Sequence, residues 1–168
     1  MPDPTEPWFV VNATEKPWEA APGWGRSVAF DTRDAPFPDY GINIHVLEPG
    51  ERSTMYHGEA AQEGFLVLSG SPTLIVEGEE RVLKAWDYVH CPAWTRHAFA
   101  NASDAPCTIL MTGARSAGVE PDCVYPVDPV AQRHGAGVRD ETPDPSVAYA
   151  EKPRDEEEPY RRGTLPGA

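Results

Sequence analysis

Residues 40–115 contain a succession of short β-strand segments separated by turn-forming residues, and this pattern constrains the fold most strongly. Ile42, Ile44 and Val46 alternate with polar residues, which predicts a half-buried strand. So many short strands at this spacing are typical of a β-sandwich or β-barrel, and no helical period of useful length occurs here. We therefore predict an all-β fold, with further strands at residues 65–69, 73–77, 81–83, 88–90, 97–100 and 108–112.

Residues 1–39 are predicted to be an N-terminal extension of this barrel, with short strands at 8–11 and 27–30. The segment holds three of the tryptophans, Trp8, Trp18 and Trp24, and many prolines. Proline cannot donate a ladder hydrogen bond and is confined to strand edges and turns. We therefore expect the extension to wrap around the barrel rather than to supply central strands.

Residues 116–168 are predicted to be a Pro-rich, acidic C-terminal extension. Residues 130–134 could form one or two helical turns, and the acidic run at 155–158 is interpreted as solvated. The last thirty or so residues lack an apolar period, so we expect them to be weakly structured or folded only against the core.

Charge and composition exclude several classes of function. The chain has 168 residues and a formal net charge of −13, and an acidic surface repels phosphate backbones, so no nucleic-acid partner is expected. No apolar run approaches the roughly 20 residues that span a bilayer, and the N-terminus lacks the pattern of a signal peptide. We expect a soluble, cytoplasmic protein with no membrane partner.

The three cysteines indicate neither a disulfide framework nor a cysteine-based zinc site, because their number is odd and no C-x-x-C occurs. Cys91 and Cys107 are interpreted as packing residues of the core, although Cys91 could also line a cavity. The sequence also lacks a serine-nucleophile elbow, a P-loop and a dinucleotide-binding G-x-G-x-x-G.

Two histidines and a glutamate in two short stretches, 49–70 and 84–101, suggest chemistry. His57, Glu63 and His97 together offer a ligand set for a divalent metal. Strand alternation places Glu63 on the same face as Phe65, and it places His97 on the same face as Phe99. If these aromatic side chains fill the barrel, both ligands point inside, where an unpaired carboxylate would cost several kcal/mol that a cation offsets.

Residues 40–115 resemble the cupin family, whose first motif is G-x5-H-x-H-x3/4-E-x6-G and whose second is G-x5-P-x-G-x2-H-x3-N. In the first motif this sequence supplies Gly50, Glu63 and Gly70, and in the second it supplies Pro92, His97 and Asn101. Strings such as YHGEAAQEGFLVLSG look like those of small, single-domain bacterial cupins without a settled function. The resemblance implies a double-stranded β-helix, or jelly-roll barrel, that holds one divalent ion of Fe, Mn, Ni or Zn.

The first motif departs from the family pattern at the H-x-H. The shorter spacing before Glu63 places His57 at the first histidine position and Glu59 at the second, whereas the longer spacing places Tyr56 and Gly58 there. We favour the shorter spacing, in which Glu59 is a harder, anionic fourth donor that shifts the preference toward Mn or Fe. The alternative is that Glu59 is a solvated turn residue.

Two motif glycines are replaced by tryptophan. Trp86 and Trp94 stand where turn glycines are usual, and a bulky residue at positive φ is rare, so we expect both turns to have changed conformation. Trp94 either overhangs the barrel mouth, where it would offer a stacking surface, or caps the barrel.

The remaining histidines, His45, His90 and His134, match no motif ligand. His45 or His90 could act as a general base if it faced the cavity, but a position on the strand surface is the favoured interpretation. Tyr56 is a weaker candidate for a hydrogen bond to substrate.

Three functions fit these residues, because one barrel can host all of them. The first is a metal-dependent enzyme acting on a small molecule, most plausibly an oxygenase. The second is a metal-dependent isomerase, epimerase or lyase, in which the ion polarises a carbonyl. The third is a non-catalytic module that binds a ligand or a metal. The resemblance also implies a homodimer, in which the Trp-rich N-terminal segment could add to a partner's sheet.

Overall fold

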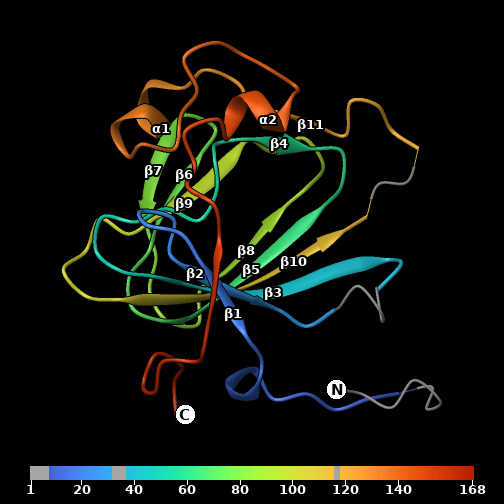
Figure 1. Ribbon diagram of the computed structural model, residues 1–168. Helices are drawn as coiled ribbons and strands as arrows, with labels where there is room; N and C mark the ends of the chain where they lie inside the picture. Colours follow the sequence, from blue (N-terminus) through green and yellow to red (C-terminus); the bar gives the residue numbers. More distant parts are fainter. Residues whose placement is uncertain (1–7, 32–36, 116–117) are drawn as a thin grey trace.

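The computed structural model describes residues 8–31, 37–115 and 118–168 (Figure 1). Its strands are β1 (Trp18–Ala20), β2 (Arg26–Ala29), β3 (Tyr40–Leu47), β4 (Gly58–Glu59), β5 (Glu63–Ser69), β6 (Thr73–Val76), β7 (Glu79–Val82), β8 (Tyr88–Cys91), β9 (His97–Ala100), β10 (Cys107–Ala114), β11 (Cys123–Val124) and β12 (Glu156–Glu158). Its helical segments are the 3₁₀ turn η1 (Ala13–Glu15), α1 (Pro129–Arg133) and α2 (Pro145–Ala148). Among the described residues, no helix is long and apolar enough to cross a membrane.

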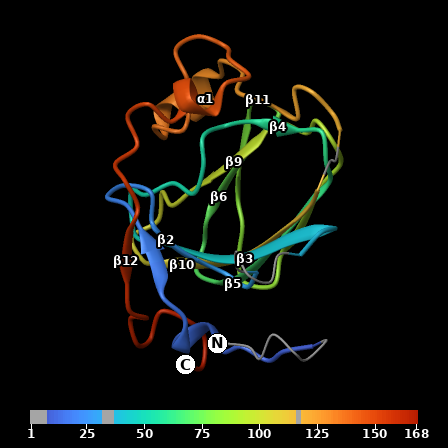
Figure 2. The same cartoon turned by 45° about the vertical axis from the view of Figure 1, so that its right-hand side comes forward.

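The strands predicted between residues 40 and 115 are all present, which confirms the all-β prediction. They form a seven-stranded sheet in the order β12-β1-β2-β3-β10-β5-β8 and a three-stranded sheet in the order β7-β6-β9, with β11 and β4 paired beside them. The two larger sheets face each other across the barrel (Figures 1 and 2). Leu47, Phe65 and Ile109 of the large sheet pack in one cluster with Leu74 and Phe99 of the small sheet.

The outer face of the large sheet is also buried. Ile44 and Val46 of β3 point away from the barrel interior, lie beside Trp18 and Val28 of the neighbouring strands, and pack in one cluster with Ala13 of the N-terminal extension. Tyr160, from the C-terminal extension, packs against the same cluster. In both views η1 and the C-terminal end lie on this side of the sheet (Figures 1 and 2). The two extensions therefore cover a sheet face that would otherwise expose branched apolar side chains to water.

The N-terminal extension corrects two predictions. The strand expected at 27–30 is present as β2, but it lies between β1 and β3 in the interior of the sheet instead of wrapping around the barrel. This is possible because Arg26–Ala29 contains no proline, so every backbone N–H of β2 can donate. Residues 8–11 do not form the predicted strand.

The acidic run of the C-terminal extension is exposed at Asp155, Glu156 and Glu157, as the sequence predicted, but part of it forms a strand. Its residues 156–158 form β12, which pairs antiparallel with β1. Glu158 lies 3.2 Å from the guanidinium of the buried Arg26 and 2.6 Å from Arg161. The strand thus supplies a counter-charge to a buried arginine, which would be costly to leave unpaired. β12 also pairs the edge of β1 within the chain; the homodimer itself stays a prediction.

Two tight turns have a positive φ at the tryptophan that stands in place of a motif glycine. Asp87 N–H donates to the carbonyl of Lys84 (3.0 Å), and Thr95 N–H donates to that of Pro92 (3.1 Å). Trp86 and Trp94 occupy the third positions of these turns with φ of 73° and 69°. The predicted change of turn conformation is therefore wrong. The turns accommodate tryptophan because both indoles extend toward solvent, with 73% of Trp86 and 44% of Trp94 exposed.

We predict that the backbone of Trp86 is strained and that glycine relieves the strain. A positive φ costs an L-residue about 1 kcal/mol relative to glycine. The free energy of unfolding of Trp86→Gly should therefore exceed that of Trp86→Ala by about 1 kcal/mol in urea titrations. The comparison with alanine removes the indole from both variants. Equal stabilities would show that the turn carries no such strain.

Candidate metal centre

His57 and His97 are held opposite each other by a reciprocal backbone pair. The N–H of His57 donates to the carbonyl of His97 (3.1 Å), and the N–H of His97 donates to the carbonyl of His57 (2.8 Å). His97 is the first residue of β9 and His57 directly precedes β4. Directly opposed residues of an antiparallel pair project their side chains to the same face. The two imidazole rings accordingly lie side by side, with centroids 4.8 Å apart.

Each imidazole is oriented by a backbone carbonyl two residues earlier in the chain. Nδ1 of His57 lies 2.7 Å from the carbonyl oxygen of Met55, and Nδ1 of His97 lies 2.9 Å from that of Thr95. A carbonyl oxygen can only accept, so each Nδ1 carries the proton. The Nε2 lone pair of each neutral ring is then free to bind a metal, and hydrogen bonds of this kind fix the orientation of metal-binding histidines.

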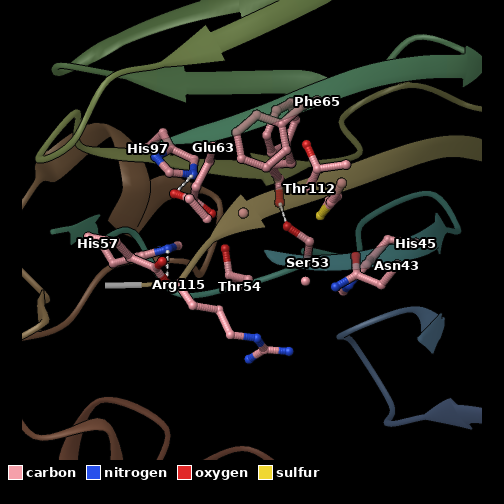
Figure 3. Close-up of a pocket in the computed structure, with 16 residues that line it drawn as sticks. Asn43, His45, Ser53, Thr54, His57, Glu63, Phe65, His97, Thr112 and Arg115 are labelled. Atoms are coloured by element: carbon pink, nitrogen blue, oxygen red, sulfur yellow. Dashed lines mark hydrogen bonds and ion pairs between the residues drawn. The ribbon is translucent and has the colours of Figure 1, made fainter. Parts of the chain in front are cut away.

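Two carboxylates complete the site. Glu63 begins β5, and its Oε2 lies 3.3 Å from Nε2 of His97 (Figure 3). Glu59 ends β4, and its Oε1 lies 3.6 Å from Nε2 of His57. Donor atoms of His57, Glu63 and His97 all lie within 4.8 Å of one another, a group that does not include Glu59. The structure thus brings together the three residues first identified in the sequence and places Glu59 beside one of them.

The charges of these groups are strongly perturbed. Burial raises the pKa of Glu63 to about 7, and the charge of Glu59 adds to this effect. Burial also lowers the pKa of His97 to about 4, with a further contribution from His57. For His57 burial acts downward on the pKa, but the neighbouring carboxylates of Glu59 and Glu63 outweigh this effect and raise the pKa. The adjacent imidazole of His57 lowers the pKa of Glu59.

These shifts describe a site that is short of positive charge. Two carboxylates lie beside an imidazole that burial keeps neutral, and the pKa of one of them, Glu63, is raised. A divalent cation would stabilise both carboxylates in their ionised form and accept both Nε2 lone pairs. The donor set of two imidazoles and one or two carboxylates suits Fe, Mn, Ni or Zn, so the residues present fit the ion that the resemblance implies.

The group formed by His57, Glu63 and His97 opens onto a cavity of about 270 Å³. Phe65, Phe99 and Met111 form its apolar lining. The polar lining consists of Asn43, His45, Ser53, Thr54, Thr112 and Arg115, together with the candidate ligands. His57, Glu63 and His97 lie at one side of the pocket, and Asn43 and His45 lie at the other (Figure 3). The volume suits a small molecule, and the mixed lining suits a polar one.

The prediction that His45 lies on the strand surface is wrong, because this residue lines the cavity. The alternation of β3 predicted that Ile44 and Val46 face the core and His45 faces solvent. Both faces of β3 are in fact covered, and the apolar pair packs under the outer extensions while His45 points inward. Burial lowers its pKa to about 4, so the imidazole is neutral at physiological pH. Among the described residues, its Nδ1 has no hydrogen-bond partner.

Other residues singled out in the sequence have different roles. Trp94 does not line the cavity, but its backbone N–H donates to the carbonyl of Glu59 (2.6 Å). Asn101 of the second motif donates to the carbonyls of Leu47 and Ala105, so it holds the turn after β9. Cys91 and Cys107 pack in the core, as predicted. His90 is exposed, His134 pairs with Glu80, and Tyr56 accepts a hydrogen bond from Gly78.

Sequence reasoning missed several residues around the site. Ser53, Thr54 and Thr112 line the cavity with hydroxyl groups, and Asn43 faces it from β3. The position of Asn43 could have been inferred once His45 was placed inside, because both have the same parity on one strand. Tyr125 and Tyr149, from the C-terminal extension, lie near His57, and no local pattern indicates this.

Comparisons with known proteins agree with this geometry. Residues 43–113 match a family model described as the cupin domain. A crystal structure of a sugar phosphate isomerase of the cupin superfamily from Silicibacter pomeroyi is 28% identical and covers 55% of this chain, with a TM-score of 0.50. The similarity spans 60% of the isomerase chain, which is less than two thirds of its length.

A second solved structure supports the fold alone. The polyketide cyclase RemF from Streptomyces resistomycificus is 16% identical, with a TM-score of 0.54. The similarity covers 68% of this chain and 88% of the cyclase. No curated protein matches this chain. The barrel, the convergence of both motif segments on one site and the family match over the same residues show that residues 43–113 are a cupin domain.

Proposed function

We propose that this chain is a metal-dependent enzyme that converts a small polar molecule at His57, Glu63 and His97. The convergence of two Nε2 lone pairs and a carboxylate at the edge of a cavity carries this proposal. Glu59 is proposed as a fourth donor, since its carboxylate lies beside Nε2 of His57. When bound, a divalent ion in such a site supplies a Lewis acid for a carbonyl oxygen or, if it is iron, a redox centre.

The reaction class that the cavity supports best is proton transfer, as in an isomerase or lyase. His45 offers a neutral imidazole on the side of the cavity opposite the metal-binding group, where it could accept a proton from a bound molecule (Figure 3). The hydroxyls of Ser53, Thr54 and Thr112 would orient polar groups of that molecule. The similarity to a sugar phosphate isomerase supports the same class.

An oxygenase is the second candidate. Two imidazoles and one carboxylate, with further positions open to small molecules, are the ligand pattern of non-heme iron oxygenases. This candidate rests on the ligand set and needs no base in the cavity. A reaction that requires His45 therefore separates the two classes.

We expect the purified wild-type protein to hold about one divalent ion per chain and His97→Ala to lose it, because the buried His97 contributes one of the three donor atoms that lie within 4.8 Å of one another. Elemental analysis of both proteins measures this. Glu59→Gln, measured alongside, should bind at least tenfold more weakly if Glu59 is a ligand. The exposed His90 provides the control, since His90→Ala should keep the ion. No stoichiometric metal in the wild type, or equal metal in wild type and His97→Ala, would refute the site.

We predict that His45 makes the metal-free protein sensitive to acid. Its ordinary pKa is 6.5, and in the folded state burial lowers it to about 4. The charge of Lys152 adds to this lowering, whereas the charge of Asp155 opposes it. Protonation therefore favours the unfolded state, and the stability present above pH 6.5 is lost as the pH falls toward 4. Relative to His45→Gln, the wild type should lose on the order of 2 kcal/mol between pH 7 and pH 4. Urea titrations measure the difference, and equal losses of stability in the wild type and His45→Gln would contradict the prediction.

Deuterium exchange distinguishes the two reaction classes. A panel of aldose and ketose phosphates, incubated in D2O under nitrogen with the zinc-loaded or manganese-loaded protein, should gain deuterium beside the carbonyl group in at least one member. His45→Gln should slow this exchange by about 100-fold, as expected for the loss of a general base. Oxygen consumption by the iron-loaded protein with no exchange would instead support the oxygenase.

A further inference from the structure

The segment 55–60, which carries His57 and Glu59, is bonded along its length to the C-terminal extension. Met55 N–H donates to the hydroxyl of Tyr149 (3.1 Å), and Tyr56 N–H donates to the carbonyl of Ala136 (2.6 Å). Gly58 and Glu59 pair with β11, and Ala60 N–H donates to the carbonyl of Asp122 (2.8 Å). In both views β11 and α1 lie at the end of the barrel where β4 is found (Figures 1 and 2).

Tyr149 is connected to the candidate ligand through a single residue. Its hydroxyl accepts the N–H of Met55, and the carbonyl of Met55 accepts the Nδ1–H of His57. By holding the backbone of Met55, the Tyr149 hydroxyl also holds the Met55 carbonyl that orients the imidazole of His57. The ring of Tyr149 is itself held edge-on to Tyr125 at 5.7 Å and packs against Trp24 at 5.4 Å.

Tyr125 provides a second contact to the same imidazole. Its ring lies 6.0 Å from that of His57, and its backbone exchanges two hydrogen bonds with Thr142. Both tyrosines belong to one apolar cluster, which also includes Met55 and Val138. The C-terminal extension therefore packs behind His57, and Tyr149 contributes a side-chain hydrogen bond to the segment that carries this histidine.

We propose that Tyr149 is a positioning residue of the metal centre, so that metal binding and docking of the C-terminal extension stabilise each other. The inference rests on the proposed metal site. A metal bound at His57 favours the orientation that Met55 and Tyr149 impose, and by linkage the docked extension raises the affinity for the metal by the same factor. Residues outside the ligand sphere that orient metal-binding histidines commonly contribute 10–100-fold in affinity.

The matched pair Tyr149→Phe and Tyr160→Phe tests this role. Each variant removes a hydroxyl that accepts one backbone N–H, from Met55 in the first case and from Leu165 in the second. Tyr160 packs under the outer face of the large sheet, away from the site. We expect Tyr149→Phe to bind Co²⁺ about tenfold more weakly than the wild type in calorimetric titrations, and the visible spectrum of its bound Co²⁺ to differ. Tyr160→Phe should match the wild type in both measurements. Equal affinities in all three proteins would overturn the proposal.

Hydrogen exchange and ¹⁵N NMR test the positioning role and the linkage independently of the affinities of the variants. In the metal-free protein, Tyr149→Phe should speed hydrogen exchange at the Met55 amide and change the ¹⁵N signature of the His57 ring, whereas Tyr160→Phe should change neither. In the wild type, Co²⁺ should slow exchange at Met55 and Tyr56 by about tenfold, and unchanged exchange would overturn the linkage. Absence of Co²⁺ binding to the wild type would refute the metal site and with it the linkage. An unchanged ¹⁵N signature of the His57 ring in Tyr149→Phe would refute the positioning role alone.

Discussion

The reciprocal backbone pair between His57 and His97 is the contact on which the site depends. It joins two segments that are forty residues apart in the chain and fixes their relative register. A shift of one residue on either side would turn one imidazole away from the other. Because each ring is also bonded through Nδ1 to a carbonyl of its own segment, the pair fixes the direction of both Nε2 atoms as well. The site is therefore organised mainly by backbone hydrogen bonds.

The second constraint is that the large sheet is buried on both faces. Its inner face meets the small sheet across the barrel, and its outer face is covered by both extensions. The extensions bury Ile44 and Val46 on the outer face of β3. The alternate residues of this strand, which are polar, therefore face the interior. This arrangement provides the cavity with Asn43 and His45, whose polar atoms would be unfavourable in a wholly apolar core. The sequence segments outside the barrel thus influence the chemistry inside it.

Much of the barrel could be predicted because its signals are local. Alternation over a few residues and turn-forming residues between strands identify β5, β6 and β9 without knowledge of their partners. The candidate ligands can be identified for a similar reason, since Glu63 and His97 lie at strand starts with a defined parity and at fixed spacings from motif residues. The errors also have physical causes. His45 was misplaced because alternation tells which residues share a face but does not tell which face is the interior. The tryptophan turns were misjudged because exposure of the indole allows a strained φ that steric rules alone disfavour.

By itself the sequence determined the all-β class, the strand positions in the barrel and the three residues that offer metal donors, because strand period, turn chemistry and motif spacing are properties of contiguous residues. Only the tertiary structure decided that Glu59 lies beside His57, that His45 faces the cavity and that Tyr149 supports the segment before β4. Each of these depends on contacts between segments distant in the chain. Such contacts are set by which surfaces remain to be covered once the sheets have paired, and no local pattern in the sequence records that.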